Sequence, residues 1–254
     1  MPHDNSVPRR DFLKAAFVTA AGLASSSPCL SAARPPALLT LGFSTYGSKA
    51  LTTEAAITLI DETGFDSLEL TIWPDWDANP VTLGRNRRRA IRKRLADTGL
   101  RVTSLMEHLH IDEGNRTRAQ RLERLKLAAG LAHDLSPKQP PLLQTTIGGG
   151  GKWADKRPAY SDEIADWMTL ADAHDLVIAV KPHRGGAFSR PDEAAELITG
   201  LGKPKRLRMC YDYSHYDFRD MTLEGTIRTA LPFVGHVAVK DVVRRDNRLR
   251  FVLP

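Results

Sequence analysis

Apolar, strand-like runs alternate with helix-like stretches along this chain about seven times, roughly 30 residues apart. The runs read LLTLGFSTYG, SLELTIW, RVTSLMEHL, PLLQTTIGGG, LVIAVKPH, LRMCYDYSH and VGHVAVKDVV. Alternation at this spacing predicts βαβ units, whose strands pair in parallel within one sheet. Because the runs are apolar throughout, we expect both faces of that sheet to be covered. The sequence therefore predicts an α/β fold.

The stretches between the runs show helical periodicity and helix-end signals. Apolar side chains share one face in two of them, at Leu122, Leu125, Ala129 and Ala132, and at Ile164, Trp167, Met168 and Ala171. Helix starts are expected at Thr53, at Ser161–Asp162 and at Pro191. Left-handed glycines that end helices are expected at Gly64, Gly99 and Gly202.

The net charge is +6, and much of it lies in the basic run RNRRRAIRKRL, residues 85–95. This run has two apolar positions at helical spacing, Ile91 and Leu95, and no aromatic residue between its cations. Single-stranded nucleic-acid sites interleave cations with aromatic rings. We therefore interpret the run as the solvated face of a helix and expect no nucleic-acid partner.

Ionisable residues lie at the ends of several strands. They are Glu69 in the second run, Glu107, His108 and His110 in the third, Lys181 and His183 in the fifth, Asp212 and His215 in the sixth, and Lys240 and Asp241 in the seventh. Such a distribution is typical of a (β/α)8-type TIM barrel, whose catalytic residues stand at the carboxyl ends of several strands. No Gly-x-Gly-x-x-Gly follows the first run, which argues against a dinucleotide-binding sheet.

Strand alternation also predicts which of these side chains point into the barrel. His108 and His110 flank Leu109, and on a strand we expect them to face opposite ways, with at most one reaching the lumen. Lys240 is the expected inward residue of the Lys240–Asp241 pair. Cys210 is expected in the core. Since only seven runs are visible before the chain stops at NRLRFVLP, we expect a barrel truncated before its eighth strand.

The first 33 residues resemble a twin-arginine export signal. Arg9 and Arg10 precede Phe12-Leu13-Lys14, and an apolar stretch and small residues up to Ala33 follow. The stretch is short and is interrupted by Lys14 and Thr19, so we expect no stable membrane span after cleavage. We predict two parts, a signal at residues 1–33 and a barrel at 34–254, and a periplasmic or extracellular location.

From about Leu38 to Pro254 the chain resembles the xylose-isomerase-like TIM barrels of the sugar phosphate isomerase/epimerase superfamily. The motifs GFDSLEL, VKPHRGGAFSRP, YDYSHYDF and VAVKD carry this resemblance, and FVLP is similar to the start of the loop that leads to the final helix and strand. The resemblance implies a divalent metal, Mn²⁺ or Mg²⁺, held by a Glu, an Asp, a His and a Glu from the fifth to the eighth strands. Asp212 matches, but Lys181 replaces the first Glu and Ala238 replaces the His, with His236 close by. The metal is therefore doubtful.

The resemblance implies proton abstraction next to a carbonyl of a small carbohydrate. If Lys181 replaces the metal as electrophile, the base would be His183, His215 or Glu69. Lys181 could instead form a structural ion pair with Asp212. The remaining predicted site residues are Trp73, Glu107 and Lys240 for substrate binding and Asp212 and His236 for a metal. Two alternatives stay open, a non-catalytic or vestigial carbohydrate-binding barrel and an apurinic-site endonuclease-like metalloenzyme. The sequence leaves the oligomeric state open.

Overall fold

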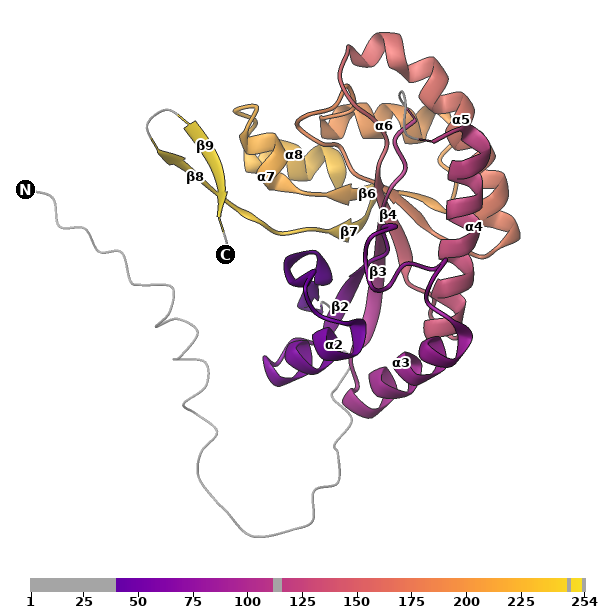
Figure 1. The fold of residues 1–254 in the computed structure, drawn as a ribbon. Coiled ribbons are helices and arrows are strands. Elements are labelled where there is room, and N and C mark those ends of the chain that lie inside the picture. The colour runs from indigo at the N-terminus through magenta and orange to yellow at the C-terminus, as the bar shows by residue number, and fades with distance from the viewer. Residues whose placement is uncertain (1–39, 112–115, 246–247, 253–254) are drawn as a thin grey trace, which may run out of the picture. The chain divides into compact units, whose positions relative to one another are not determined.

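The structure is a computed structural model, and it describes residues 40–111, 116–245 and 248–252. Seven strands form one sheet in chain order, and each pairs in parallel with the next. They are β1 (Gly42–Ser44), β2 (Ser67–Thr71), β3 (Arg101–His108), β4 (Leu142–Thr146), β5 (Ile178–Val180), β6 (Leu207–Tyr211) and β7 (Val234–Val237). Each predicted strand is confirmed. The fold is an α/β TIM barrel whose sheet has seven strands and no eighth among the described residues (Figure 1).

The sheet curls on itself, so side chains from distant strands meet on its inner side. His236 on β7 places its Nε2 atom 3.4 Å from Oε2 of Glu69 on β2 and 3.5 Å from the Ser104 hydroxyl on β3. Contacts across several strands are possible only if the inner faces converge on a lumen. The strand ends of β5, β6 and β7 therefore open onto one mouth.

Helices cover the outer side of the sheet, and successive helices pack on one another (Figure 1). They are α2 (Thr53–Glu62), α3 (Arg85–Thr98), α4 (Arg118–Leu135), α5 (Trp153–Ala173), α6 (Pro191–Gly200), α7 (Tyr213–Asp217) and α8 (Leu223–Ala230), with a short 3₁₀ helix, η2 (Thr45–Ser48), after β1. The predicted starts at Thr53 and Pro191 are confirmed. Gly64, Gly99 and Gly202 have the expected positive φ angles of 85°, 74° and 78°.

The predicted start at Ser161–Asp162 is wrong, because α5 begins at Trp153. Pro158 lies inside the helix and cannot donate a backbone hydrogen bond, which made the earlier turns look non-helical in the sequence. Trp153 compensates by packing its ring 5.5 Å from the ring of Phe188 and 6.3 Å from that of Tyr160. Tertiary packing thus retains a turn that local propensity disfavours.

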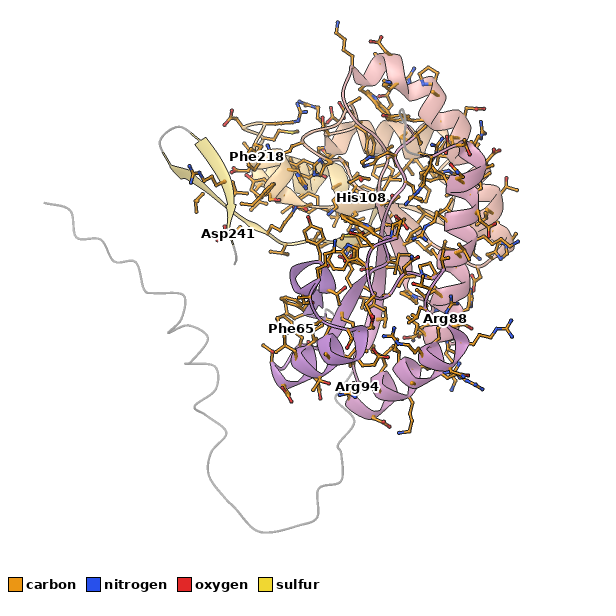
Figure 2. All side chains as sticks on the ribbon, in the orientation of Figure 1. Phe65, Arg88, Arg94, His108, Phe218 and Asp241 are labelled. Atoms are coloured by element: carbon orange, nitrogen blue, oxygen red, sulfur yellow. The ribbon has the colours of Figure 1, made fainter. Side chains whose placement is uncertain are left out.

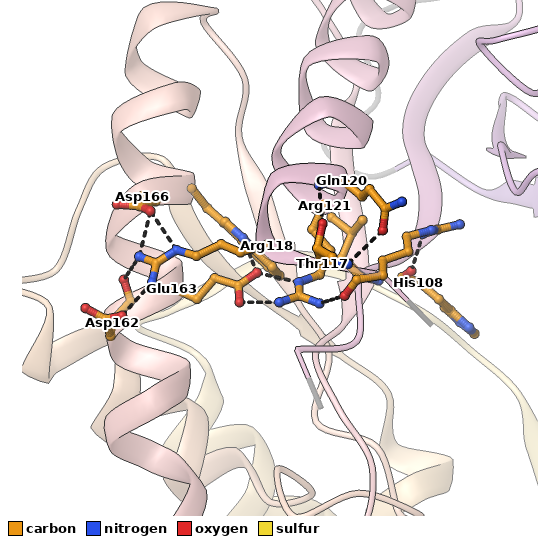
Figure 3. Close-up of polar contacts among 12 residues, drawn as sticks. His108, Thr117, Arg118, Gln120, Arg121, Asp162, Glu163 and Asp166 are labelled. Carbon is orange, nitrogen blue, oxygen red and sulfur yellow. Dashed lines mark hydrogen bonds and ion pairs between the residues drawn. The ribbon is translucent and has the colours of Figure 1, made fainter. Parts of the chain in front are cut away.

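Polar contacts join α4 to α5 (Figure 3). Arg118 pairs with Asp162 and Asp166, and the buried Arg121 places its Nε atom 2.5 Å from Oε1 of Glu163. Thr117 caps α4 by accepting the backbone N–H of Gln120. These contacts fix the helix behind β3 and β4.

The apolar faces of the helices pack against the sheet to form one core. On α3 the buried residues are Ile91 and Leu95, so the basic run forms a helix with a solvated face, as predicted. No helix in the described part of the chain is long and apolar enough to cross a membrane.

A two-stranded antiparallel hairpin, β8 (Asp241–Arg245) and β9 (Arg248–Val252), follows β7. The expectation that FVLP begins a loop is wrong for its first two residues, because Phe251 and Val252 lie in β9. In the antiparallel register Phe251 pairs with Val242 and Val252 with Asp241, so these two residues are strand residues of the hairpin. Phe251 comes from this hairpin to the barrel mouth.

Candidate active site

Three neighbouring strands deliver one carboxylate and two ammonium groups to the mouth of the lumen. Asp212 follows β6, and its Oδ2 atom lies 3.5 Å from Nζ of Lys181, which follows β5. The same oxygen lies 3.0 Å from Nζ of Lys240, which follows β7. The carboxyl ends of parallel strands meet at one edge, so three residues far apart in the sequence converge. The structural ion pair between Lys181 and Asp212, one of the two interpretations of Lys181, is present.

Two histidines complete this cluster. His215, in α7, places its Nε2 atom 3.3 Å from Oδ2 of Asp212 and 3.1 Å from Nζ of Lys240. The His183 ring lies 4.2 Å from the His215 ring, centroid to centroid. His215 is buried, whereas His183 is partly exposed. We call Lys181, His183, Asp212, His215 and Lys240 the mouth cluster.

The charges of the mouth cluster depend on one another. Burial opposes the ionisation of Asp212, but the hydrogen bond from His215 and the charges of Lys181 and Lys240 hold its pKa well below the usual range. Burial likewise opposes the charge of Lys181, yet the carboxylates of Asp212 and Glu69 keep its pKa raised. Asp212 is therefore an anion and Lys181 a cation at neutral pH.

The other groups of the mouth cluster shift toward their neutral forms. Burial, the neighbouring His215 and the two lysines lower the pKa of His183 to about 3. Burial lowers the pKa of His215 as well, although Asp212 opposes the shift. Burial and the charge of Lys181 lower the pKa of Lys240, again against the effect of Asp212. The two lysines therefore differ, because their surroundings move their pKa values in opposite directions.

Glu69 and His236 lie deeper in the lumen. Glu69 accepts hydrogen bonds from the Ser44 and Ser104 hydroxyls at 2.8 and 2.7 Å, and His236 contacts its second oxygen. Burial would raise the pKa of Glu69, but the His236 and Ser104 hydrogen bonds and the charge of Lys181 lower it. The structure thus places His236 against Glu69, not against Asp212.

Aromatic rings form a second wall of the mouth, beyond β2 and β3. The Trp73 ring lies 4.2 Å from the His108 ring and 5.5 Å from the Tyr46 ring. The His108 and His110 rings stack 5.3 Å apart with an interplanar angle of 18°. The expectation that these two histidines face opposite ways is wrong, because β3 ends at His108 and strand alternation stops there. Burial lowers the pKa of His108 to about 3, together with the neighbouring cations.

Glu107 is not brought to the mouth cluster. Its side chain is buried on the helix-facing side of β3, where Oε2 pairs with Arg124 of α4 and Oε1 lies 3.3 Å from Nη1 of Arg116. Cys210 is fully buried, as predicted for a core residue, and burial raises the pKa of its thiol to about 12.

Several residues at the mouth were missed in the sequence. Ser214 donates to Oδ1 of Asp212 at 2.5 Å. Phe251 of β9 packs 5.6 Å from the His215 ring and 5.0 Å from the Phe218 ring, and the guanidinium of Arg184 lies 4.0 Å from the Phe218 ring centre. Figure 2 shows Phe218 beside the hairpin. Ser214, Arg184, Phe218 and Phe251 all lie within the quoted motifs, but FVLP was expected to begin a loop, so Phe251 was not expected at the mouth.

The mouth cluster does not fit the divalent metal that the resemblance implies. Ammonium groups approach the one matching ligand, Asp212, on its Oδ2 atom, where they repel a cation. Lys181 takes the place of an anionic ligand, and His236 is paired with Glu69. The described residues contain no group of three or more His, Cys, Asp or Glu side chains that could hold a metal ion. We derive no step through a metal.

Comparison with solved structures shows the same fold at low sequence identity. The probable 3-DHS dehydratase of Bacillus anthracis superposes with a TM-score of 0.67 at 17% identity, over 80% of this chain and 74% of that one. The 3-keto-D-glucoside 4-epimerase of E. coli superposes with a TM-score of 0.62 at 17% identity, over 80% and 79% of the two chains. At such identity the likeness shows the fold alone.

A sequence match links part of the chain to a curated human protein. The putative hydroxypyruvate isomerase of Homo sapiens is 39% identical over 57 residues, which are 22% of this chain and only 20% of that protein. Over residues 57–252 the sequence matches the family described as "Xylose isomerase-like TIM barrel". This match spans six of the seven sheet strands, the whole mouth cluster and the hairpin as far as Val252. The resemblance seen in the motifs is confirmed, and the chain belongs to the xylose isomerase-like TIM barrel family.

Proposed function

We propose that this chain catalyses proton transfer at a carbon next to the carbonyl group of a small carbohydrate, as in isomerisation or epimerisation. The observation that carries the proposal is the charged, buried Lys181, held at the lumen mouth by Asp212 beside the neutral imidazole of His183. Removal of such a proton puts negative charge on the carbonyl oxygen. A lysine ammonium stabilises that negative oxygen by a charge-assisted hydrogen bond. In metal-dependent enzymes a bound cation stabilises the same charge.

The proton acceptor in this proposal is His183. It is the more exposed of the two cluster histidines, and its low pKa keeps it unprotonated at neutral pH. Its Nδ1 atom accepts the backbone N–H of Gly185 at 3.3 Å, so this nitrogen carries the lone pair. Substrate binding would exchange that long contact for the substrate C–H. The nearby ammonium groups make the protonated ring a strong acid, which favours return of the proton to the substrate.

The aromatic wall supports a carbohydrate as the substrate. Sugar rings present flat C–H faces that pack on aromatic side chains, and hydroxyl groups that need hydrogen-bond partners. Trp73 offers such a ring, which packs against the His108 and Tyr46 rings at the mouth. The names of two similar proteins, a 3-keto-D-glucoside epimerase and a putative hydroxypyruvate isomerase, point to the same class of compound.

A non-catalytic carbohydrate-binding barrel remains the second candidate, because the ion pair between Lys181 and Asp212 could be purely structural. Both candidates predict ligand binding, and only the enzyme predicts exchange of a substrate proton. The test incubates the protein in D₂O with D-fructose, D-psicose, D-tagatose and hydroxypyruvate, and follows loss of the C–H signal next to the carbonyl by NMR.

The proposal predicts exchange with at least one compound, and a loss of about tenfold or more in the Lys181→Met variant, equivalent to about 1.4 kcal/mol of barrier. His183→Asn should abolish exchange while leaving ligand affinity intact. Lys93 is exposed on α3, so Lys93→Met is the matched control and should exchange like the wild type. Ligand-induced thermal stabilisation with no exchange would identify the binder and refute the enzyme.

We further propose that the chain is exported by the twin-arginine route. The support is the Arg9–Arg10 pattern, which lies outside the described residues. Expression of the full chain in a bacterium with and without a twin-arginine translocase, followed by cell fractionation, tests this. Replacement of both arginines by lysine should keep the protein in the cytoplasm, and an unchanged periplasmic fraction would contradict export by this route.

A further inference from the structure

Asp212, His215 and Lys240 contact one another at the barrel mouth, where Nζ of Lys240 also lies 3.0 Å from Oδ2 of Asp212. Lys240 Nζ lies 3.1 Å from Nε2 of His215, and that nitrogen lies 3.3 Å from Oδ2 of Asp212. Nδ1 of His215 is buried with no partner among the described residues, so the ring makes its polar contacts through Nε2. Asp212 and His215 are almost fully buried, whereas the side chain of Lys240 is 38% exposed.

This arrangement is typical of an activated nucleophile. In such sites the nucleophile lies within hydrogen-bond reach of a base, and a third group orients the base. Lys240 is the accessible amine, His215 the base that can take its proton, and Asp212 the anion that stabilises the resulting imidazolium.

The weakness of His183 as a base points in the same direction. A group with a pKa of about 3 removes a proton from carbon only if that carbon is strongly activated. A protonated imine withdraws electrons more strongly than a neutral carbonyl does. We infer that Lys240 forms an imine with the carbonyl carbon of the substrate, an inference that rests on the proposed function and gives it an electron sink without a metal.

The step balances with groups at the mouth. His215 takes one proton from the Lys240 ammonium, and the freed Nζ lone pair attacks the carbonyl carbon as the C=O π electrons move to oxygen. Lys181 gives that oxygen a proton and recovers one from the attacking nitrogen, which leaves a neutral carbinolamine. His215 then returns its proton to the hydroxyl, water departs, and a C=N⁺–H bond forms. The net change is ammonium plus carbonyl to protonated imine plus water, with no oxidant or reductant.

The surroundings of the two lysines favour Lys240 over Lys181 as the nucleophile. Lys181 is buried beside Asp212, and the negative charges of Asp212 and Glu69 keep it protonated. The charged and titratable groups that interact with Lys240 include Asp212, His215, His183, Lys181 and the neutral thiol of Cys210. The Phe251 ring lies 4.6 Å from its Nζ atom. Burial and the like charge of Lys181 together favour the unprotonated amine.

Reductive trapping tests the imine on the full-length protein. The probe is dihydroxyacetone, the simplest ketose, with sodium cyanoborohydride at pH 7, followed by peptide mass mapping. We expect the reduced adduct on Lys240 to form at least about tenfold faster than on the exposed Lys93, because His215 lies within reach to take the proton of the Lys240 ammonium. The His215→Asn variant should slow the labelling of Lys240 to the rate of Lys93.

A Lys240 peptide labelled no faster than the Lys93 peptide would overturn the inference. Circular dichroism shows whether each variant is folded. The rate at which acetic anhydride acetylates Lys240 in the wild-type protein measures the nucleophilicity of this amine independently. The D₂O assay on the same preparation separates the two proposals. Proton exchange without trapping would refute the imine and leave the Lys181 mechanism standing, whereas trapping without exchange would keep the imine and refute proton transfer.

Discussion

The ion pair behind β3 yields the sharpest stability prediction. Glu107 is 1% exposed, and Arg124 places its Nε atom 2.8 Å from Oε2 of this residue. Arg124 also donates to Asn79 Oδ1 at 2.9 Å and to the carbonyl of Ile72 at 2.6 Å, so its guanidinium cannot turn to solvent. Glu107→Gln removes the counter-charge and leaves this cation buried. Breaking a buried pair on one side costs about 3–5 kcal/mol.

That cost is large beside the roughly 5–15 kcal/mol that stabilises a typical folded protein. A domain of this size loses about 2–4 °C in Tm for each kcal/mol, so Glu107→Gln should lower the Tm by roughly 6–20 °C. Thermal unfolding followed by circular dichroism measures the shift. Glu123 is exposed on the same helix as Arg124, and Glu123→Gln should leave the Tm within a degree or two.

Glu107 was also a predicted substrate-binding residue, and the same variant decides between the two roles. A structural role predicts lower stability with unchanged ligand affinity below the new Tm. If Glu107→Gln melted with the wild type but lost ligand affinity, the reasoning from the buried ion pair would be refuted.

Three further outcomes are expected. Burial and nearby cations lower the pKa of His108 from 6.5 to about 3, so the folded protein binds a proton at this residue less readily than the unfolded chain does. The free energy of unfolding should therefore fall as the pH falls from 6.5 toward 3. Urea unfolding measured across that window should show a weaker pH dependence of this free energy in His108→Asn than in the wild type. In Gly186→Ala the new Cβ would lie 2.6 Å from the Gly148 carbonyl oxygen, and this clash should lower the free energy of unfolding by about 1–3 kcal/mol. In Gly185→Ala the nearest atom would lie 3.5 Å away, so the same urea assay should give nearly the wild-type value. Trp73→Ala should weaken carbohydrate binding in calorimetry with little effect on Tm, and equal affinity would remove the aromatic wall from the substrate site.

The fold was predictable because its signal is repeated. Seven apolar runs with helix-like stretches between them leave few alternatives to a parallel sheet covered by helices. The start of α5 was not predictable, since Pro158 weakens the local signal and the first turns are retained by tertiary contacts, among them the packing of Trp153 on Phe188. Local rules fail where a tertiary contact supplies the missing stability.

The site was predictable to the extent that strand ends determine it. Lys181, Asp212 and Lys240 converge because parallel strands end at one edge, and this convergence needs no knowledge of side-chain packing. Glu107 could not be placed in the same way, because its partner Arg124 lies 17 residues along the chain and on a different element. Phe251 was missed because it contacts His215 only through the fold of the β8–β9 hairpin, and local sequence signals do not predict such a contact.

The strands that carry the mouth cluster differ in how firmly they are held. β5 and β6 have a hydrogen-bonded neighbour on both sides, whereas β7 pairs only with β6 among the described residues and alternates between half-buried and exposed positions. Local opening begins where a segment has few partners. Amide hydrogen exchange at Val234–Val237 should therefore be faster than in β5. Lys240 directly follows β7, so its position depends on whether this strand stays paired. Heating should detach Lys240 from Asp212 before the molecule unfolds, so the proposed imine chemistry of Lys240 should be lost at a lower temperature than the fold.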